Sequence, residues 1–220
     1  MVKKAFIFDL DGVIVDTAKY HFLAWQKLAK TLGIDFTEHQ NEQLKGVSRI
    51  KSLEKILAWG NKTVSDEDFE NLMAQKNTDY LGYIAKMNAD EILPKISETL
   101  DYLKNSGQAV ALGSASKNAR MILEKVNILQ KFDVIIDGND VSKAKPDPEV
   151  FLMAAKGCGV AAENAIVFED AVAGIQAANA ANMISIGIGE KKTLQEADYV
   201  FKDFTEISSD FLKQLINTKH

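Results

Sequence analysis

Short, strongly apolar runs with high strand propensity recur along this 220-residue chain, and segments of helical spacing separate the later ones. Most of the runs lack strict alternation of apolar and polar residues, which is typical of strands covered on both faces of a parallel sheet. Strands that alternate with helices favour an α/β fold with a doubly wound, Rossmann-like parallel sheet. The predicted strands are 5–8, 109–113, 133–137, 165–168, 183–189 and 198–201, and the predicted helices between the later ones are 118–126, 148–158 and 171–181.

A block of about seventy residues after the first predicted strand breaks this alternation. It has no strong strand signal, and apolar residues recur at helical spacing in 22–32, 53–57 and 66–87, the last of which is one long helix or a pair. We therefore predict two domains. An inserted α-helical cap domain occupies 17–88, and an α/β core domain is formed by 1–16 together with 89–220.

Residues at the ends of the predicted helices give more local expectations. Pro94 is expected in the first turn of a helix that Gly107 ends, because proline suits the first helical position and glycine suits the end. Asp16 is expected to cap the first helix of the cap domain, while Thr17 has either a capping role or a role in the site. The sequence AAKGCGV around Cys158 reads as a helix end, which favours a buried thiol.

Composition excludes several classes of protein. The net charge of −5 argues against a general nucleic-acid partner, and the single cysteine excludes an internal disulfide. No apolar run reaches the roughly 18 residues of a membrane span. Asp9 and Asp11 interrupt the first apolar run far short of a signal-peptide core. We expect a soluble cytoplasmic protein, and a monomer because no exposed apolar helix face is evident.

Polar and charged residues follow four of the predicted strands directly. In open α/β sheets, ligands bind beyond the carboxyl ends of the strands, so these residues are expected to meet at one edge. They are Asp9 and Asp11 after the first strand, Ser114, Ala115 and Ser116 after the second, Lys143 and Lys145 in the loop after the third, and Glu169 and Asp170 after the fourth.

This set of side chains suits phosphoryl transfer. Gathered carboxylates repel one another unless a cation neutralises them, and hard oxygen ligands with no His or Cys nearby select Mg²⁺. Ser114 and the neighbouring backbone N–H groups can form an anion cradle, and Lys145 adds a cation. One aspartate can take the phosphoryl group covalently, while its neighbour two residues further on moves the proton.

Four short motifs in this order resemble the signature motifs of the haloacid dehalogenase (HAD) superfamily. They are DLDGV at 9–13, S-A-S at 114–116, K-P at 145–146 and E-D at 169–170. The resemblance implies a nucleophile at Asp9 and a general acid/base at Asp11, whose backbone carbonyl joins a Mg²⁺ site. It also implies that Asp9, Glu169 and Asp170 complete the metal site and that Ser114 and Lys145 hold the transferring phosphoryl group.

Further segments are similar to a sugar phosphomutase branch of that superfamily: 20–29, 41–49, 52–57 and 114–118. That branch interconverts β-D-glucose 1-phosphate and glucose 6-phosphate through an aspartyl-phosphate and bound β-glucose 1,6-bisphosphate, and its members are isomerases. The resemblance implies that Arg49, with Ser116, Lys117 and Asn118, grips the distal phosphate. It assigns Thr17, His21 and Lys76 to a hinge and cap network that engages Asp11, and Gly46, Val47 and Ser52 to the sugar pocket.

Other functions stay open at this point. A HAD-family sugar-phosphate phosphatase would use the same core chemistry with water in place of the sugar hydroxyl. A phosphonate hydrolase would need a cap lysine as a Schiff base, and Lys45 or Lys76 could be misread as one. A catalytically silent binding module on this fold is disfavoured because all the motif residues are intact.

Each singled-out residue also has a purely structural interpretation. Asp9 and Asp11 can belong to a turn, Glu169 and Asp170 can cap the helix that follows, and Lys145 can be a solvated loop lysine with Lys143 in the site. His21 on its own is expected to be structural, and Lys76 can belong either to the site or to a solvated helix face. The four motifs together favour the catalytic interpretation.

Overall fold

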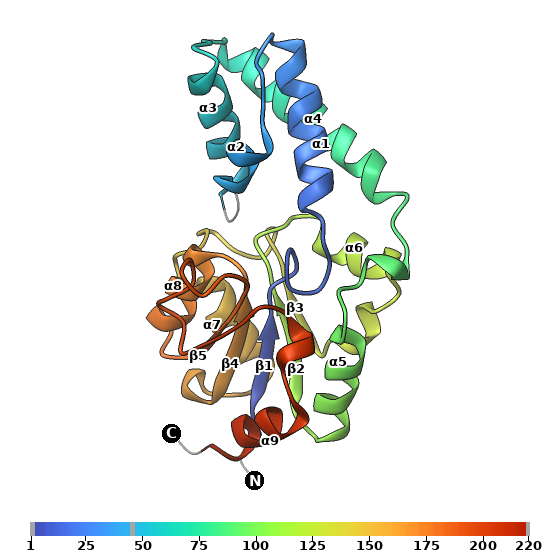
Figure 1. Ribbon diagram of the computed structural model, residues 1–220, viewed down its shortest axis with the longest axis vertical. Helices are drawn as coiled ribbons and strands as arrows, with labels where there is room; N and C mark the ends of the chain where they lie inside the picture. Colours follow the sequence, from blue (N-terminus) through green and yellow to red (C-terminus); the bar gives the residue numbers. More distant parts are fainter. Residues whose placement is uncertain (1–2, 45–46, 219–220) are drawn as a thin grey trace. The chain divides into compact units, whose positions relative to one another are not determined.

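The computed structural model describes residues 3–44 and 47–218. The chain divides into two compact units, which Figure 1 colours along the sequence. The core unit is Met1–Asp16 with Asn88–His220, and the helical unit is Thr17–Met87. Asn88, which was predicted to end the cap domain, lies in the core unit.

The core unit is built on one parallel sheet, which confirms the predicted α/β class. Its six strands lie in the order β3-β2-β1-β4-β5-β6, so β1 has a partner on each side. Phe8 at the end of β1 is in register with Leu112 of β2 and Phe168 of β4. The strand bounds are β1 Ala5–Phe8, β2 Ala109–Gly113, β3 Val134–Ile136, β4 Ala165–Glu169, β5 Ile184–Ile188 and β6 Tyr199–Phe201.

Both faces of this sheet are apolar, which is why the strands lack alternation. Ile7 of β1 packs in a cluster with residues of α7 (Glu149–Gly157) and α8 (Val172–Ala180), including Phe151 of α7. Phe6 and Phe8, which point to the opposite face, stack with Phe168, and Phe8 also stacks with Phe204. The core helices are α5 Ile96–Asn105, α6 Ala119–Lys125, α7 Glu149–Gly157, α8 Val172–Ala180 and α9 Ser209–Asn217, with short 3₁₀ segments at Ala89–Glu91, Leu129–Lys131, Ala162–Asn164 and Phe204–Glu206.

Three local expectations were wrong or incomplete. Pro94 lies before α5, not in its first turn, because Lys95 takes the N-cap position in a left-handed conformation at φ 69°. Asp16 does not cap α1, since Thr17 holds the N-cap position and makes no side-chain capping bond. Cys158 ends α7 as predicted, but it is half-buried rather than buried.

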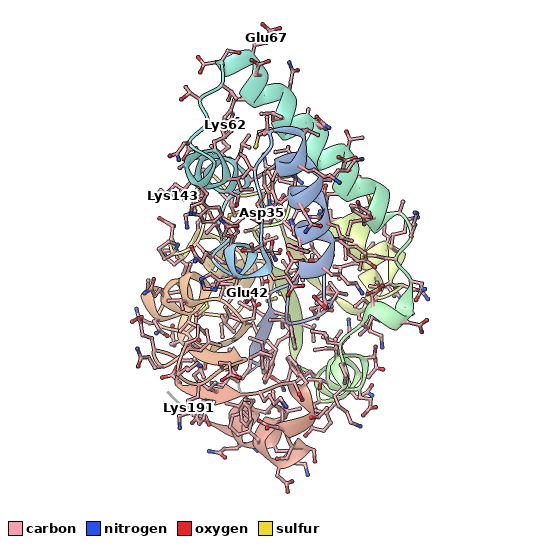
Figure 2. The ribbon with its side chains drawn as sticks, turned by 45° about the horizontal axis from the view of Figure 1, so that its top comes forward. Asp35, Glu42, Lys62, Glu67, Lys143 and Lys191 are labelled. Carbon is pink, nitrogen blue, oxygen red and sulfur yellow. The ribbon has the colours of Figure 1, made fainter. Side chains whose placement is uncertain are left out.

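The helical unit contains α1 Ala18–Thr31, α2 Glu38–Glu42, α3 Arg49–Trp59 and α4 Asp66–Ile84. The stretch from residue 66 is thus one long helix rather than a pair, and Ser65 caps it by accepting a hydrogen bond from the Asp68 backbone. Its acidic first turn faces solvent, as the exposed Glu67 in Figure 2 illustrates. Trp25, Leu28 and Leu53 belong to the apolar cluster that holds the unit together.

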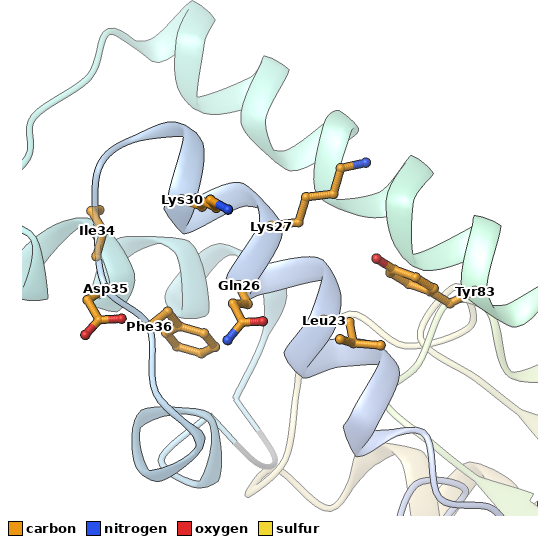
Figure 3. A pocket seen from close by; sticks show the side chains of 8 residues that line it. All are labelled: Leu23, Gln26, Lys27, Lys30, Ile34, Asp35, Phe36 and Tyr83. Carbon is orange, nitrogen blue, oxygen red and sulfur yellow. The ribbon is translucent and has the colours of Figure 1, made fainter.

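A groove of about 600 Å³ lies on the helical unit beside α1 (Figure 3). Its lining combines lysines with apolar side chains and contains none of the predicted site residues: Leu23, Gln26, Lys27, Lys30, Ile34, Asp35, Phe36 and Tyr83. Lys27 at this groove pairs with Asp79 at 2.6 Å. Within residues 3–44 and 47–218, no helix is both long and apolar enough to cross a membrane.

Candidate active site

The centre of the site is an ion triad at the carboxyl ends of two neighbouring strands. Asp9 directly follows β1, and Glu169 is the last residue of β4, so the register of these strands places the two carboxylates side by side. Lys145 Nζ lies 2.6 Å from Asp9 Oδ1 and 2.8 Å from Glu169 Oε2, and it also donates to the Gly113 carbonyl at 3.1 Å. The side chains of all three charged residues are at most 9 % exposed.

The triad has a definite charge pattern. Burial works to lower the pKa of Lys145, but the charges and hydrogen bonds of Asp9 and Glu169 outweigh it and hold that pKa above its usual value. Burial raises the pKa of Glu169 to about 7, with Asp9 adding to the rise and Lys145 opposing it. Lys145 is therefore a permanent cation that offsets the charge of Asp9.

Lys143, the alternative lysine, lies elsewhere. Its side chain is 68 % exposed and pairs with Asp147 at 3.3 Å. Figure 2 shows it at the surface. The peptide bond between Lys145 and Pro146 is cis. The structure thus selects Lys145 over Lys143 as the lysine beside Asp9.

The carboxylates fit a divalent cation. Asp9, Glu169 and Asp170 each offer one oxygen, and these oxygens lie within 4.8 Å of one another. Three carboxylates beside one lysine carry an excess of negative charge, and an all-oxygen donor set is the one that Mg²⁺ prefers. Asp11 lies next to this group and donates its backbone N–H to Asp9 Oδ2 at 3.0 Å.

Two glycines allow the chain to approach these carboxylates. Gly12 has φ 76°, and a Cβ there would overlap the Asp170 carboxylate. A Cβ at Gly174 in α8 would overlap the Glu169 side chain. Neither glycine was predicted to have this role, although glycine in DLDG and in AVAG is the available signal.

The loop of residues 114–118 (the 114–118 loop) follows β2 at the same edge of the sheet. Ser114 is buried, and its backbone N–H donates to Ile136 of β3 at 3.0 Å. The Ser116 N–H donates to Ser114 Oγ at 3.1 Å, and the Asn118 N–H donates to Ser116 Oγ at 3.3 Å. The backbone N–H groups of Ala115 and Lys117 make no hydrogen bond within the part of the chain that the structure describes. They alternate with the bonded N–H groups of Ser114, Ser116 and Asn118, and both residues are exposed.

His21 and Lys76 meet within the helical unit. Lys76 Nζ lies 2.8 Å from His21 Nδ1. The same Nζ lies over the ring of Trp25 at 4.8 Å and over the ring of Tyr80 at 4.6 Å. Lys76 is only 1 % exposed, so its interpretation as part of a solvated helix face was wrong. Burial, then Lys76 and Arg49, hold the pKa of His21 well below its usual value.

The aromatic partners of Lys76, which are Trp25 and Tyr80, were not predicted from the sequence. The available signal was spacing: His21 and Trp25 are four residues apart on α1, and Lys76 and Tyr80 are four apart on α4. The His21 ring also packs on Tyr80, with the ring centroids 4.2 Å apart. These four side chains form one cluster.

The remaining predicted residues lie in the helical unit. Thr17 and Ser52 are buried, and Arg49 is the first residue of α3, where burial lowers its pKa. Val47 is half-buried. Gly46 and Lys45 lie outside the described residues. The predicted site residues therefore form two groups, one in each unit.

Comparisons with known proteins agree with these motifs. The family model described as haloacid dehalogenase-like hydrolase matches residues 3–182. β-Phosphoglucomutase of Bacillus subtilis is 40% identical over 213 residues, which cover 96% of this chain and 94% of that protein. The crystal structure of β-phosphoglucomutase from Clostridium difficile has a TM-score of 0.92 and 43% identity, with 98% of each chain covered.

A phosphatase is also among the relatives. Phosphorylated carbohydrates phosphatase of Thermotoga maritima is 27% identical over 220 residues, covering 97% of this chain and all of that protein. Its identity is lower than that of the B. subtilis mutase over a similar length. The chain is thus a homologue of β-phosphoglucomutases, which are isomerases, and it belongs to the haloacid dehalogenase-like hydrolase family.

Proposed function

We propose that this chain is a Mg²⁺-dependent β-phosphoglucomutase that interconverts β-D-glucose 1-phosphate and glucose 6-phosphate. The reaction passes through an aspartyl-phosphate and β-glucose 1,6-bisphosphate. The observation that carries the proposal is the buried Asp9–Lys145–Glu169 triad in a chain so similar to mutases over nearly its full length. We further propose a monomer that works in the cytoplasm and binds sugar phosphates rather than nucleic acid or membranes.

Asp9 is the nucleophile. A carboxylate oxygen of Asp9 attacks phosphorus, a P–O bond to the sugar breaks, and the leaving sugar oxygen takes a proton from Asp11. In the reverse half-reaction Asp11 takes the proton from the attacking sugar hydroxyl, and the phosphoryl group moves to that oxygen. Lys145 and Ser114, with the Ala115 N–H, hold the phosphoryl oxygens and offset their charge.

The residues that would hold Mg²⁺ are Asp9, Glu169, Asp170 and the backbone carbonyl of Asp11. The gathering of three carboxylate oxygens within 4.8 Å supports this assignment. When bound, the ion would neutralise carboxylate and phosphoryl charge at the site. Lys145 and the Asp11 backbone keep the Asp9 carboxylate in one orientation, since they donate to its two oxygens.

A mutase must hold a phosphate at each end of the sugar and must keep water from the phospho-aspartate. Arg49 with Ser116, Lys117 and Asn118 grips the second phosphate, and Gly46, Val47 and Ser52 shape the sugar pocket. Thr17, His21 and Lys76 engage Asp11 when the cap closes, so proton transfer starts only with a sugar in place. The His21–Lys76 contact at 2.8 Å supports a shared role for that pair.

A sugar-phosphate phosphatase is the second candidate, favoured by the likeness to the Thermotoga maritima phosphatase. The two functions differ in whether a sugar hydroxyl or water accepts the phosphoryl group from Asp9. One assay separates them: the protein is mixed with Mg²⁺, β-glucose 1-phosphate and a trace of glucose 1,6-bisphosphate, and glucose 6-phosphate and free phosphate are followed together. Dominant glucose 6-phosphate supports the mutase, and dominant phosphate supports the phosphatase. If neither product forms, both functions are contradicted.

A further inference from the structure

The four residues after β3, Asp137 to Asp140 (the 137–140 turn), lie against the 114–118 loop. The turn closes on itself, since the Asp140 N–H donates to the Asp137 carbonyl at 3.0 Å and the Asp137 N–H donates to Asp140 Oδ2 at 2.8 Å. None of its residues belongs to the motifs discussed above. The turn therefore needs a separate explanation.

Two hydrogen bonds join the turn to carbonyls of the 114–118 loop. The Gly138 N–H donates to the Ser116 carbonyl at 3.2 Å, and Asn139 Nδ2 donates to the Lys117 carbonyl at 3.0 Å. With these carbonyls held by the turn, the orientation of the adjoining peptide groups is fixed. The backbones are in close contact as well, because a Cβ at Gly138 would overlap the Ala115 carbonyl.

Buried charge keeps the turn in place. Asp137 is 1 % exposed, and its Oδ1 accepts from the Asn139 N–H at 2.8 Å and from Asn139 Nδ2 at 3.0 Å. Its Oδ2 pairs with Arg120 Nε at 3.1 Å. Arg120 Nη2 donates to the Ile135 carbonyl at 2.8 Å and to Asp140 Oδ2 at 3.3 Å. Arg120 thus ties α6, which follows the loop, to the turn that supports it.

The two halves of the loop are supported differently. Ser114 at its start is fixed by the sheet, through its bond to Ile136. Lys117 near the end of the loop is fixed by Asn139. Asp137 in turn holds Asn139 by accepting from its backbone N–H and from its side-chain Nδ2. Ala115 belongs to the half proposed to hold the transferring phosphoryl group, and Lys117 to the half proposed to hold the second phosphate.

We propose that Asp137, Asn139 and Arg120 are positioning residues that set the affinity of the site for the second phosphate of its substrate. They do so by fixing the peptide group between Lys117 and Asn118, whose carbonyl Asn139 holds. Gly138 has a distinct part, since its lack of a side chain lets Ala115 take up its place at the transferring phosphoryl group. The inference rests on the proposed phosphoryl transfer and deepens it, because it separates the supports of the two phosphate positions.

The principal test is Asn139→Ala against Asn179→Ala. Asn179 is a matched control because its Nδ2 also donates to a backbone carbonyl, that of Glu196 at 2.9 Å, on α8. Calorimetric titration with glucose 6-phosphate in Mg²⁺ is expected to give binding about fivefold to tenfold weaker for Asn139→Ala, as for one lost hydrogen bond, and unchanged for Asn179→Ala. Equal affinities in the two variants, or a wild-type protein that does not bind glucose 6-phosphate, would overturn the role of Asn139.

The second readout is hydrolysis of acetyl phosphate, a phosphoryl donor with one phosphate and no sugar. Asn139→Ala is expected to leave its turnover within about twofold, while Gly138→Ala, which pushes on the Ala115 backbone, lowers it about tenfold or more. An equal loss in both variants would indicate general damage to the loop and overturn the proposal. Neither readout requires a mutase, so a wild-type protein that forms no glucose 6-phosphate would count against the proposed function alone.

Discussion

Lys145 in the core unit and Lys76 in the helical unit both have buried side chains, but these are held in different ways. Lys145 Nζ lies between two carboxylates, at 2.6 Å from Asp9 and 2.8 Å from Glu169. Lys76 Nζ lies 2.8 Å from the imidazole of His21 and over the rings of Trp25 and Tyr80. One lysine is thus surrounded by opposite charge, and the other contacts an imidazole and two aromatic faces.

The difference indicates two uses for a buried cation. The carboxylates around Lys145 raise its pKa, and it compensates charge at the place where a phosphoryl group would arrive. Lys76 compensates no charge on His21. As an ammonium group it can only donate, so His21 Nδ1 must accept and the imidazole proton must be on Nε2. The first lysine serves charge balance, and the second fixes the tautomer of a histidine.

The largest expected effect is that of Lys145→Ala. Removing the cation leaves Asp9 and Glu169 facing each other and takes a donor from the proposed phosphoryl site, so kcat/KM for β-glucose 1-phosphate should fall by about 10²–10³-fold or more. Lys143→Ala is the matched control, because this neighbouring lysine is exposed and should leave kcat/KM unchanged. Steady-state kinetics of both variants measure the difference.

Stability should separate the two lysines as well. Two buried carboxylates left without their cation cost roughly 3–5 kcal/mol of unfolding free energy, so Lys145→Ala should unfold at lower denaturant than Lys143→Ala. Urea unfolding followed by circular dichroism measures this, and it also shows that the variant is folded in the assay. If Lys145→Ala kept normal kcat/KM, the charge-balance role of Lys145 would be wrong.

Lys76→Met should have a smaller and more selective effect. Without the ammonium, His21 is free to change tautomer, and the proposed engagement of Asp11 would be lost. Mutase turnover should then fall about tenfold to a hundredfold, and the ratio of free phosphate to glucose 6-phosphate should rise. Lys27→Met is the control in the same unit, because Lys27 is exposed and pairs with Asp79. A product ratio that is the same in both variants would contradict the cap network.

The gathering of Asp9, Lys145 and Glu169 could be expected from the sequence because it depends on local features. Asp9 and Glu169 each come at the end of an apolar run, and parallel strands deliver such residues to one edge. The helical unit was less predictable. Lys76 is flanked by polar residues, so nothing local indicates that tertiary packing buries it. The contacts of α1 with α4 place Trp25 against its ammonium group, while Tyr80 lies four residues further along α4 itself.

Two local errors have similar causes. α2 was not predicted because a helix of five residues is too short to show helical spacing. Its capping box, formed by Thr37 and Gln40, was the available sequence signal. Pro94 fits a helix start by rule, but Lys95 takes a left-handed conformation that non-glycine residues seldom adopt, and this moves the start of α5 to Ile96. Such choices are decided by the surrounding fold rather than by the residues themselves.

Trp25→Leu should have a still smaller effect than Lys76→Met. It removes one of the two rings under the ammonium group, and a cation–π contact of this kind corresponds to about threefold to tenfold in the product ratio. Trp59→Leu is the control, since Trp59 stacks on Phe36 in the same unit. If both tryptophan variants shifted the product ratio equally, the effect would come from packing and not from the cation.

The smallest expected effect concerns the pH dependence of stability. The pKa of His21 is lowered by burial, Lys76 and Arg49, so between that pKa and about 6.5 the unfolded chain binds a proton that the native protein does not. His21 should therefore make the unfolding free energy fall as pH drops below about 6.5, by at most about 1.4 kcal/mol per pH unit. Glu169, with its pKa raised to about 7, acts in the opposite direction over the same range. The difference between the wild type and His21→Gln isolates the His21 contribution.

Urea unfolding at pH 5.5, 6.5 and 7.5 should thus show that His21→Gln loses less stability on acidification than the wild type. His39→Gln is the control, because His39 is exposed on α2 and should follow the wild type. Lys76→Met should weaken the slope too, because removing the neighbouring ammonium allows the pKa of His21 to rise. A His21→Gln protein with the wild-type slope would mean that His21 takes up its proton as readily in the native protein as in the unfolded chain, and a protonated imidazole could not accept from Lys76.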